Sequence, residues 1–166
     1  LRAHPQAAQV QERACRALCS VCYATDAAGR ARSQRAVEAG AIEVVVEALR
    51  AHPQVAALQA QACRSLGNVC DGTDAAGRAR KQRAADAGAI EAVVVAMQAH
   101  AQVAAVQENG CRALVSVCGA SAAARARRQR AVQVGGRTVA VAAMQAHPDH
   151  GAVQENGQEL LILLLE

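Results

Sequence analysis

Residues 77–83 read Gly-Arg-Ala-Arg-Lys-Gln-Arg, and residues 29–35 read Gly-Arg-Ala-Arg-Ser-Gln-Arg, 48 positions earlier. The segment returns at 124–130 as Ala-Arg-Ala-Arg-Arg-Gln-Arg. Ala-His-Pro-Gln and its variants recur at 3–6, 51–54, 99–102 and 146–149, at intervals of 48, 48 and 47 residues. The cysteine series keep the spacing of 48: Cys15, Cys63, Cys111 and Cys22, Cys70, Cys118. Several landmarks on one period indicate an array of stacked structural units.

Each period predicts three helices. A short one covers about 80–87 and ends at Gly88, where the chain turns sharply. A second follows over about 89–98, with apolar residues at helical spacing. A third, over about 53–70, combines an apolar stripe with a polar stripe on another face. The chain is 52% hydrophobic but only 1% aromatic and has three prolines, which favours an all-α fold with small core side chains.

Two segments of this pattern resemble the armadillo repeat family. They are Gln82-Arg-Ala-Ala-Asp-Ala-Gly-Ala-Ile90 and Cys63-Arg-Ser-Leu-Gly-Asn-Val-Cys70. Helical units with a period near 40–47 residues are typical of armadillo and HEAT arrays. The resemblance covers essentially the whole chain. It implies a right-handed α-solenoid superhelix of three-helix repeats, here with a period of about 48 residues.

The repeats predict one domain over 1–166, with a partial unit at 1–24 and repeats at about 25–72, 73–120 and 121–166. Solenoid ends normally carry polar capping repeats. The apolar run at 160–165 does not look like such a cap. We therefore expect a fragment of a longer array, or ends that pair between molecules into a homo-oligomer.

The resemblance implies that the third helices line a concave surface on which a partner lies. In importin-α-like members, a Trp and an Asn one turn apart hold an extended peptide there, and the Asn bonds the peptide backbone. Asn68 stands at that Asn position and Arg64 at that Trp position. The predicted contact residues are Arg13, Arg16, Ser20, Gln61, Arg64, Asn68, Asn109, Arg112 and Ser116.

Arginine in place of the Trp changes the expected ligand. Arg16, Arg64 and Arg112 in a row would repel a basic nuclear-localisation peptide, whereas they can bind carboxylates or phosphates bidentately. We expect a non-catalytic scaffold for a protein or peptide partner, bound as an extended, acidic segment. The simplest alternative is that these arginines are only solvated.

Two other functional classes stay open. A structural array would assemble by end-to-end stacking of its repeats. A HEAT-like enzyme, such as those that handle tetrapyrroles, would need a deep acid-lined pocket that this sequence does not display. No catalytic residues are recognisable.

A cluster of basic residues begins each first helix. Such a ridge can contact a phosphate backbone. However, no aromatic residue is interleaved, and acidic residues lie close by, so we expect a solvated edge and no nucleic-acid partner. The clusters are Arg30, Arg32, Arg35; Arg78, Arg80, Lys81, Arg83; and Arg125, Arg127, Arg128, Arg130.

Seven cysteines and no visible export signal favour reduced thiols and a cytoplasmic location. The C-x-x-C at 19–22 is not repeated in the other units, so the cysteines are predicted to be small core residues rather than metal ligands, and no cofactor is expected. The longest aliphatic run, at 160–165, is too short to cross a bilayer, so no membrane partner is expected.

The third repeat departs from the pattern. Arg137 replaces the apolar residue seen at Ile42 and Ile90, and Gly110 and Gly157 each weaken a helix by about 1 kcal/mol relative to Ala. We expect the C-terminal half to be less stable than the first two units. The histidines that end the second helices, at His4, His52, His100 and His147, are expected to donate to helix-end carbonyls.

Overall fold

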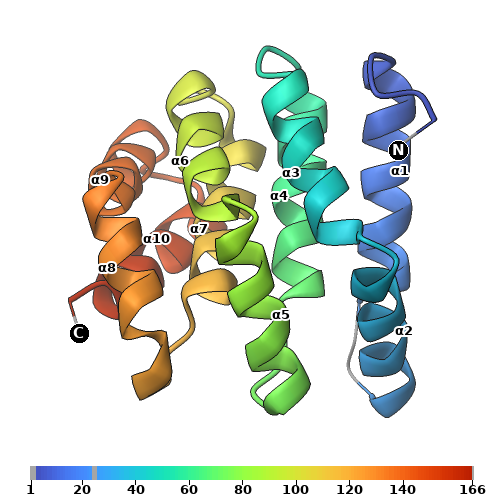
Figure 1. Ribbon diagram of the computed structural model, residues 1–166. Coiled ribbons are helices and arrows are strands. Elements are labelled where there is room, and N and C mark those ends of the chain that lie inside the picture. Colours follow the sequence, from blue (N-terminus) through green and yellow to red (C-terminus); the bar gives the residue numbers. More distant parts are fainter. Residues whose placement is uncertain (1–2, 24–25, 166) are drawn as a thin grey trace.

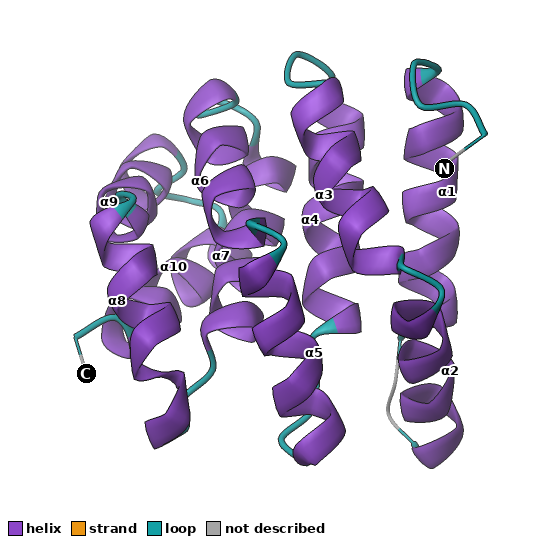
Figure 2. Cartoon of the chain, viewed as in Figure 1, coloured by secondary structure: helices purple, strands orange, loops and turns teal. Residues whose placement is uncertain are grey.

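The computed structural model describes residues 3–23 and 26–165, and these form helices joined by short loops (Figure 2). The predicted all-α class is confirmed. Four longer helices form one layer, here called the long-helix layer: α1 (Ala8–Val21), α4 (Ala56–Val69), α7 (Ala104–Cys118) and α10 (Gly151–Leu163). Each packs against the next in chain order, so that α1 and α10 lie at opposite ends of the row (Figure 1).

The shorter helices form a second layer, which faces the viewer in Figure 1 and is here called the short-helix layer. Its members are α2 (Ala27–Glu38), α3 (Ala41–Ala51), α5 (Ala75–Asp86), α6 (Ala89–Ala99), α8 (Arg125–Gln133) and α9 (Gly136–Ala146), with a 3-10 turn η1 (Ala122–Ala124) before α8. In the described part of the chain, no helix is long and apolar enough to cross a membrane.

The turns between the shorter helices depend on glycine. Gly40, Gly88 and Gly135 all have positive φ, between 82° and 93°, just before α3, α6 and α9. Other residues rarely adopt this conformation, so glycine is required there. The sharp turn predicted at Gly88 is thus present. Helix α5 begins earlier than predicted, at Ala75, because the Asp74 side chain accepts a hydrogen bond from the Gly77 amide at 2.7 Å.

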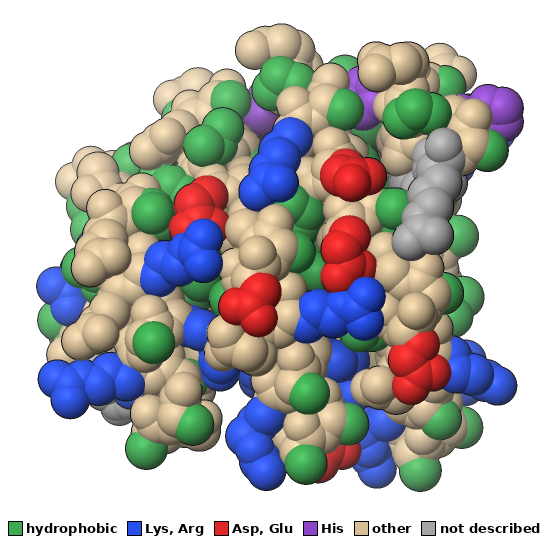
Figure 3. All heavy atoms as spheres, in the orientation of Figure 1, with side chains coloured by type: hydrophobic (Ala, Val, Ile, Leu, Met, Phe, Trp, Pro, Cys, Tyr) green, Lys and Arg blue, Asp and Glu red, His purple; other side chains and the backbone are tan. Residues whose placement is uncertain are grey.

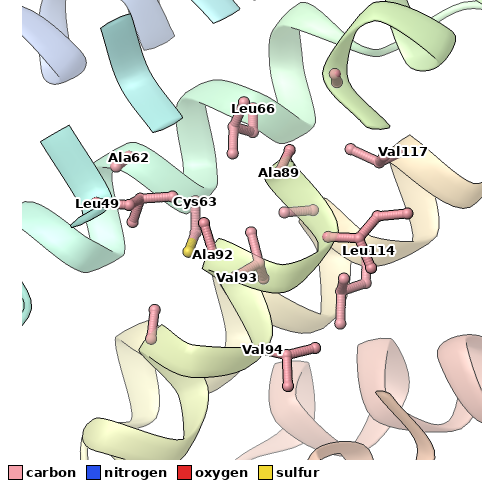
Figure 4. Close-up of a cluster of buried hydrophobic side chains, with 14 of the residues drawn as sticks. Leu49, Ala62, Cys63, Leu66, Ala89, Ala92, Val93, Val94, Leu114 and Val117 are labelled. Atoms are coloured by element: carbon pink, nitrogen blue, oxygen red, sulfur yellow. The ribbon is translucent and has the colours of Figure 1, made fainter. Parts of the chain in front are cut away.

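The core is made of small aliphatic and sulfur side chains, several of which meet between α4, α6 and α7 (Figure 4). All seven cysteines are buried free thiols, as expected for small core residues. Burial raises the pKa of five of these thiols to about 12: Cys15, Cys63, Cys70, Cys111 and Cys118. Thiols of this kind are chemically inert.

A glutamine on each of α4, α7 and α10 ties that long helix to the short helix before it, and those of α4 and α7 are buried. Gln59 Nε2 donates to the carbonyls of Leu49 and His52, at 2.9 and 2.8 Å. Gln107 makes the same pair of bonds near the end of α6, and Gln154 near the end of α9. These bonds satisfy helix-end carbonyls that would otherwise be left without donors.

The basic clusters are only partly solvated, which corrects the prediction of an exposed edge. Arg80 is 2% exposed, and its Nε donates to the Val69 carbonyl at the end of α4, 2.8 Å away. Arg127 is also buried and donates to the Val117 carbonyl of α7 at 2.9 Å. A cation at a helix C-terminus offsets the partial negative charge of its carbonyls.

Other charged and polar groups link one unit to the next. Arg83 pairs with Glu43 of the preceding unit at 2.6 Å, and Arg130 pairs with Glu91. Side chains of both signs are interleaved across the short-helix face (Figure 3). Three of the four histidines named above make a similar link, because each bonds a loop carbonyl 46 or 47 positions earlier, in the pairs His52–Pro5, His100–Pro53 and His147–Ala101. The sequence had suggested that the histidines bond carbonyls at the ends of their own helices. The printed bonds of these three rings go instead to the loop carbonyls.

Two expectations about the C-terminal half of the chain change. Arg137 is exposed rather than in the core, and its guanidinium donates to the Leu164 carbonyl at the end of α10. Gly110 makes room for a side chain, since a Cβ there would lie 2.5 Å from Met97 Cγ. Likewise, a Cβ at Gly157 would lie 2.7 Å from Met144 Cγ. These two glycines therefore have a packing role that helix propensity alone does not reveal.

Candidate functional site

A polar groove of about 530 Å³ lies on the long-helix layer between α1 and α4. We call it the α1–α4 groove. Five of the nine predicted contact residues come together in it, accompanied by two that were not predicted. Its lining residues are Arg16, Cys19, Ser20, Tyr23, Gln61, Arg64 and Asn68.

The groove is positively charged. The side chains of Arg16 and Arg64 are both exposed, and none of the lining residues is acidic. Neither guanidinium is in a salt bridge with a carboxylate of the described chain. Two open guanidiniums one repeat apart can together bind carboxylate or phosphate oxygens.

Asn68, which was predicted to bond a peptide backbone, is bonded within the chain. It is only 4% exposed, and its Nδ2 donates to the Cys19 carbonyl of α1 at 2.9 Å. Its Oδ1 accepts a hydrogen bond from Arg112 Nη2 of α7. The amide thus joins three neighbouring long helices and leaves little of the side chain for the backbone of a bound peptide.

Arg112 is also engaged within the chain, although it was predicted to continue the row of open guanidiniums. Its guanidinium lies over Gly67 of α4 and bonds Asn68. The absence of a side chain at Gly67 and the acceptor on Asn68 together explain why this arginine folds back onto α4. The open basic strip is therefore shorter than predicted, and within the groove it consists of Arg16 and Arg64.

The other predicted contact residues lie outside the groove or bond their own helix. Asn109 Nδ2 donates to the Ala105 carbonyl one turn earlier, at 2.7 Å. Ser20, within the groove, contacts the Arg16 carbonyl at 3.4 Å. Ser116 is half-buried on α7, and Arg13 is exposed on α1, and neither lines the groove.

The side chain of Gln61 has a hydrogen-bond acceptor that lacks a donor. Its Oε1 is buried and has no hydrogen-bond partner among the described residues. An unsatisfied buried acceptor costs about 1–3 kcal/mol.

Tyr23 is the one groove residue that brings an aromatic ring, and the sequence did not single it out. It is 63% exposed and lies just after the end of α1. Its spacing in the sequence could have identified it. Tyr23 stands seven residues after Arg16 and three after Ser20, so it continues the same helical stripe by one turn.

Elsewhere, a smaller and largely apolar cavity of about 240 Å³ lies between α3 and α6, lined by Leu49, Arg50, Pro53, Gln59, Glu91, Ala92, Val95, Ala96 and Ala99. Across the described ranges, no group of three or more His, Cys, Asp or Glu side chains is placed to hold a metal ion.

No protein-family model, no curated protein and no solved structure matches this chain. The candidate site therefore depends on the geometry and charge of its own residues.

Proposed function

We propose that this chain is a non-catalytic scaffold that binds an acidic or phosphorylated extended segment of a partner protein in the α1–α4 groove. The observation that carries the proposal is the pair of exposed guanidiniums, Arg16 and Arg64, in a groove with no acidic lining residue. Without a carboxylate of their own chain, both are free to bind anionic side chains bidentately.

The remaining lining residues suit a peptide rather than a free anion. Ser20 offers a hydroxyl, and the ring of Tyr23 is exposed. A segment that lies in the groove can contact these groups as well as the two guanidiniums. Arg16 and Arg64 supply the charge, and the buried Asn68 and the half-buried Arg112 hold the helices that position them.

The armadillo resemblance belongs to the same proposal. We take the stacked helices to be a right-handed α-solenoid of three-helix repeats, with the long helices on the concave side. A cytoplasmic location would suit the seven free thiols, which need a reducing compartment to remain unpaired.

The test is a fluorescence-anisotropy titration with two labelled peptides of equal length, one rich in Glu and one rich in Lys. The acidic peptide should bind more tightly, and Arg64→Glu should weaken it at least tenfold. Arg30→Glu is the matched control, since Arg30 is exposed on α2 and lies outside the groove. Equal affinity for the two peptides, or equal loss in both variants, would refute the proposal.

A further inference from the structure

The ammonium group of Lys81, the only lysine of the chain, has no partner within the described structure. Lys81 lies on α5 and is half-buried, in the region where α5 packs against α7 (Figure 1). It makes no hydrogen bond and no salt bridge with any described residue. Lysine is rarely buried in proteins unless it is paired. The ammonium group can therefore bind a group that the chain itself does not supply.

The residues at the equivalent position in the other two units are bonded within the chain. Ser33 on α2 donates to the Cys22 carbonyl at 3.3 Å. Arg128 on α8 donates to two carbonyls of the loop after α7, both at 3.0 Å. Lys81 is thus the exception among three corresponding polar side chains.

The carbonyl of Asp71 explains this exception. It corresponds to the carbonyl of Gly119, which Arg128 bonds in the next unit. The Asp71 carbonyl, however, already accepts a hydrogen bond from Arg80 Nη2 at 2.6 Å. With that acceptor in use, the side chain of Lys81 lies instead against Gly119.

A second cation with an open donor lies at the same glycine. A Cβ atom on Gly119 would lie 3.6 Å from Lys81 Nζ and 3.7 Å from Arg127 Nη2, so both cationic groups flank this residue. Arg127 uses its Nε for two carbonyls at the end of α7 and its Nη1 for Gln82, but its Nη2 has no partner among the described residues. Because Gly119 has no side chain, a small group has room next to the two cations.

The turn between α7 and α8 lacks the carboxylates of the preceding turn. Asp71 and Asp74 lie in the turn between α4 and α5, and Asp74 caps α5. Gly119 and Ala122 stand at the corresponding positions, and neither the 3-10 turn nor α8 has a side-chain cap. Residues 119–130 contain four arginines and no acidic residue. The cations near Gly119 therefore have no carboxylate in their own turn.

The charges around Lys81 partly repel one another. Burial lowers the pKa of the Lys81 ammonium below its ordinary value. The cationic Arg127 and Arg80 lower this pKa as well, whereas Cys70 and Asp71 act in the opposite direction. Each nearby helix C-terminus carries only about half a negative elementary charge, so it offsets part of the positive charge. An anion beside Gly119 would relieve the remaining repulsion.

We propose that Lys81 and Arg127 bind a phosphoryl group beside Gly119, at what we call the Lys81–Arg127 site. A phosphorylated side chain carries a charge of about −1.5 to −2 near pH 7 and three strong acceptor oxygens, so it can use the open donors of both residues at once. Inorganic phosphate offers the same chemistry, whereas a carboxylate brings a single charge. The site lies between two units and apart from the α1–α4 groove, so it does not depend on the proposed scaffold function.

The test follows the single lysine by NMR. In protein made with isotope-labelled lysine, the signal of Lys81 is the only lysine signal. We expect it to shift saturably when inorganic phosphate replaces chloride at constant ionic strength, and to shift much less with acetate. The pH midpoint of the Lys81 titration should rise in phosphate, because a bound anion favours the charged ammonium.

A second titration distinguishes the two sources of the phosphoryl group. It uses a short peptide with one phosphoserine and no Asp or Glu, and the same peptide with serine. A response to the phosphopeptide but not to inorganic phosphate would assign the site to a phosphorylated partner. A response of equal affinity to both would assign it to the free anion. Either result supports the site.

Two matched variants show whether Lys81 itself binds the anion. Lys81→Gln and Arg30→Gln each remove one positive charge, and Arg30 is exposed on α2, outside both proposed sites. With the amide signal of Gly119 as the readout, Lys81→Gln should weaken phosphate binding about tenfold, the loss expected for one hydrogen bond to a charged group. Arg30→Gln and the charge-conserving Lys81→Arg should have little effect. Circular dichroism confirms that each variant is folded.

Three results would overturn the proposal. One is a Lys81 signal that responds to neither inorganic phosphate nor the phosphopeptide. Another is an equal loss of affinity in the two glutamine variants, which would mean that only the net charge matters. The third is a phosphopeptide that shifts signals of the α1–α4 groove alone, which would agree with the proposed scaffold function while contradicting the Lys81–Arg127 site.

Discussion

The side-chain amide of Asn68 donates a hydrogen bond to the backbone carbonyl of Cys19, 2.9 Å away on the neighbouring long helix. The same side chain accepts from Arg112 on the other side. One polar side chain therefore connects α1, α4 and α7. Buried polar groups that are fully paired in this way favour one arrangement of the helices over others.

Replacing this residue should destabilise the stack. Asn68→Ala leaves the Cys19 carbonyl and the Arg112 guanidinium without their partner, so the free energy of unfolding should fall by about 1–3 kcal/mol. Urea denaturation measures the change. Ser116→Ala, at the equivalent position on α7, should change stability by less than about 0.5 kcal/mol. An equal effect of the two substitutions would contradict a linking role for Asn68.

The buried glutamines should behave similarly. Gln107→Leu removes the donor to the carbonyls of Met97 and His100 while keeping a side chain of comparable size. Because two buried acceptors lose their partner, the variant should be less stable than the wild type by about 2–4 kcal/mol. Gln102→Leu, at an exposed loop position, is the control and should be nearly neutral in thermal melting. A neutral Gln107→Leu would show that these bonds add no net stability.

Two helical glycines should respond to alanine with opposite signs. At Gly67 a Cβ would meet only the Arg112 side chain, at 3.7 Å, so Gly67→Ala should stabilise the protein by about 0.5–1 kcal/mol through helix propensity. At Gly110 the Cβ would lie 2.5 Å from Met97 Cγ, inside the core, and overpacking costs about 1–3 kcal/mol. Gly110→Ala should therefore be neutral or destabilising. Stabilisation by both substitutions would refute the tight packing of Met97 on Gly110.

The buried thiols predict a loss of stability at alkaline pH. Burial raises the pKa of Cys63 and Cys111 from 9.0 to about 12, whereas the same thiols ionise near pH 9 in the unfolded chain. Below pH 9 they are neutral in both states and have no effect on the pH dependence. Between pH 9 and 12 only the unfolded chain releases their protons, so each thiol lowers stability by about 1.4 kcal/mol per pH unit.

Thermal melting between pH 7 and 11 checks this expectation. The melting temperature should be nearly constant up to pH 8 and should then fall. A Cys63→Ala, Cys111→Ala double variant should show a shallower fall than the wild type, whatever its stability at pH 7. Identical slopes for the two proteins would mean that these thiols do not titrate with unfolding.

The features that the sequence predicts well are those set by local chemistry. Gly40, Gly88 and Gly135 recur because the turn before each second helix needs a positive φ, a requirement visible in one repeat alone. The core cysteines recur because their positions admit only small side chains. Residue type and period suffice for both, and the helical class follows from the same pattern.

The features that the sequence misses depend on what lies across a helix interface. Arg78 and Arg80 belong to one basic cluster, yet Arg80 is buried because its side of α5 faces the end of α4. Arg112 and Arg64 stand at the same repeat position, yet Arg112 folds over Gly67 and Asn68 while Arg64 stays exposed. The residues of the neighbouring helix decide whether each arginine is exposed or bonded within the chain. A repeat pattern does not show these residues, because it compares equivalent positions and not positions in contact.

The lining of the candidate groove follows from the sequence only in part. The polar stripe identifies Arg16, Ser20, Gln61 and Arg64, because helical spacing places them on one face. It does not reveal that Asn68 is closed off by its neighbours, nor that the chain after α1 brings Tyr23 to the same groove.

An amide chemical-shift titration with a Glu-rich peptide tests the peptide-binding claim most directly, since it reports where the ligand lies on the folded chain. The account predicts shifts that saturate and that cluster around Arg16 and Ser20 on α1 and Arg64 on α4, and these shifts should be lost in an Arg16→Glu, Arg64→Glu variant. Shifts that cluster instead around the basic residues at the starts of α5 and α8, or no shifts at saturating peptide, would contradict it.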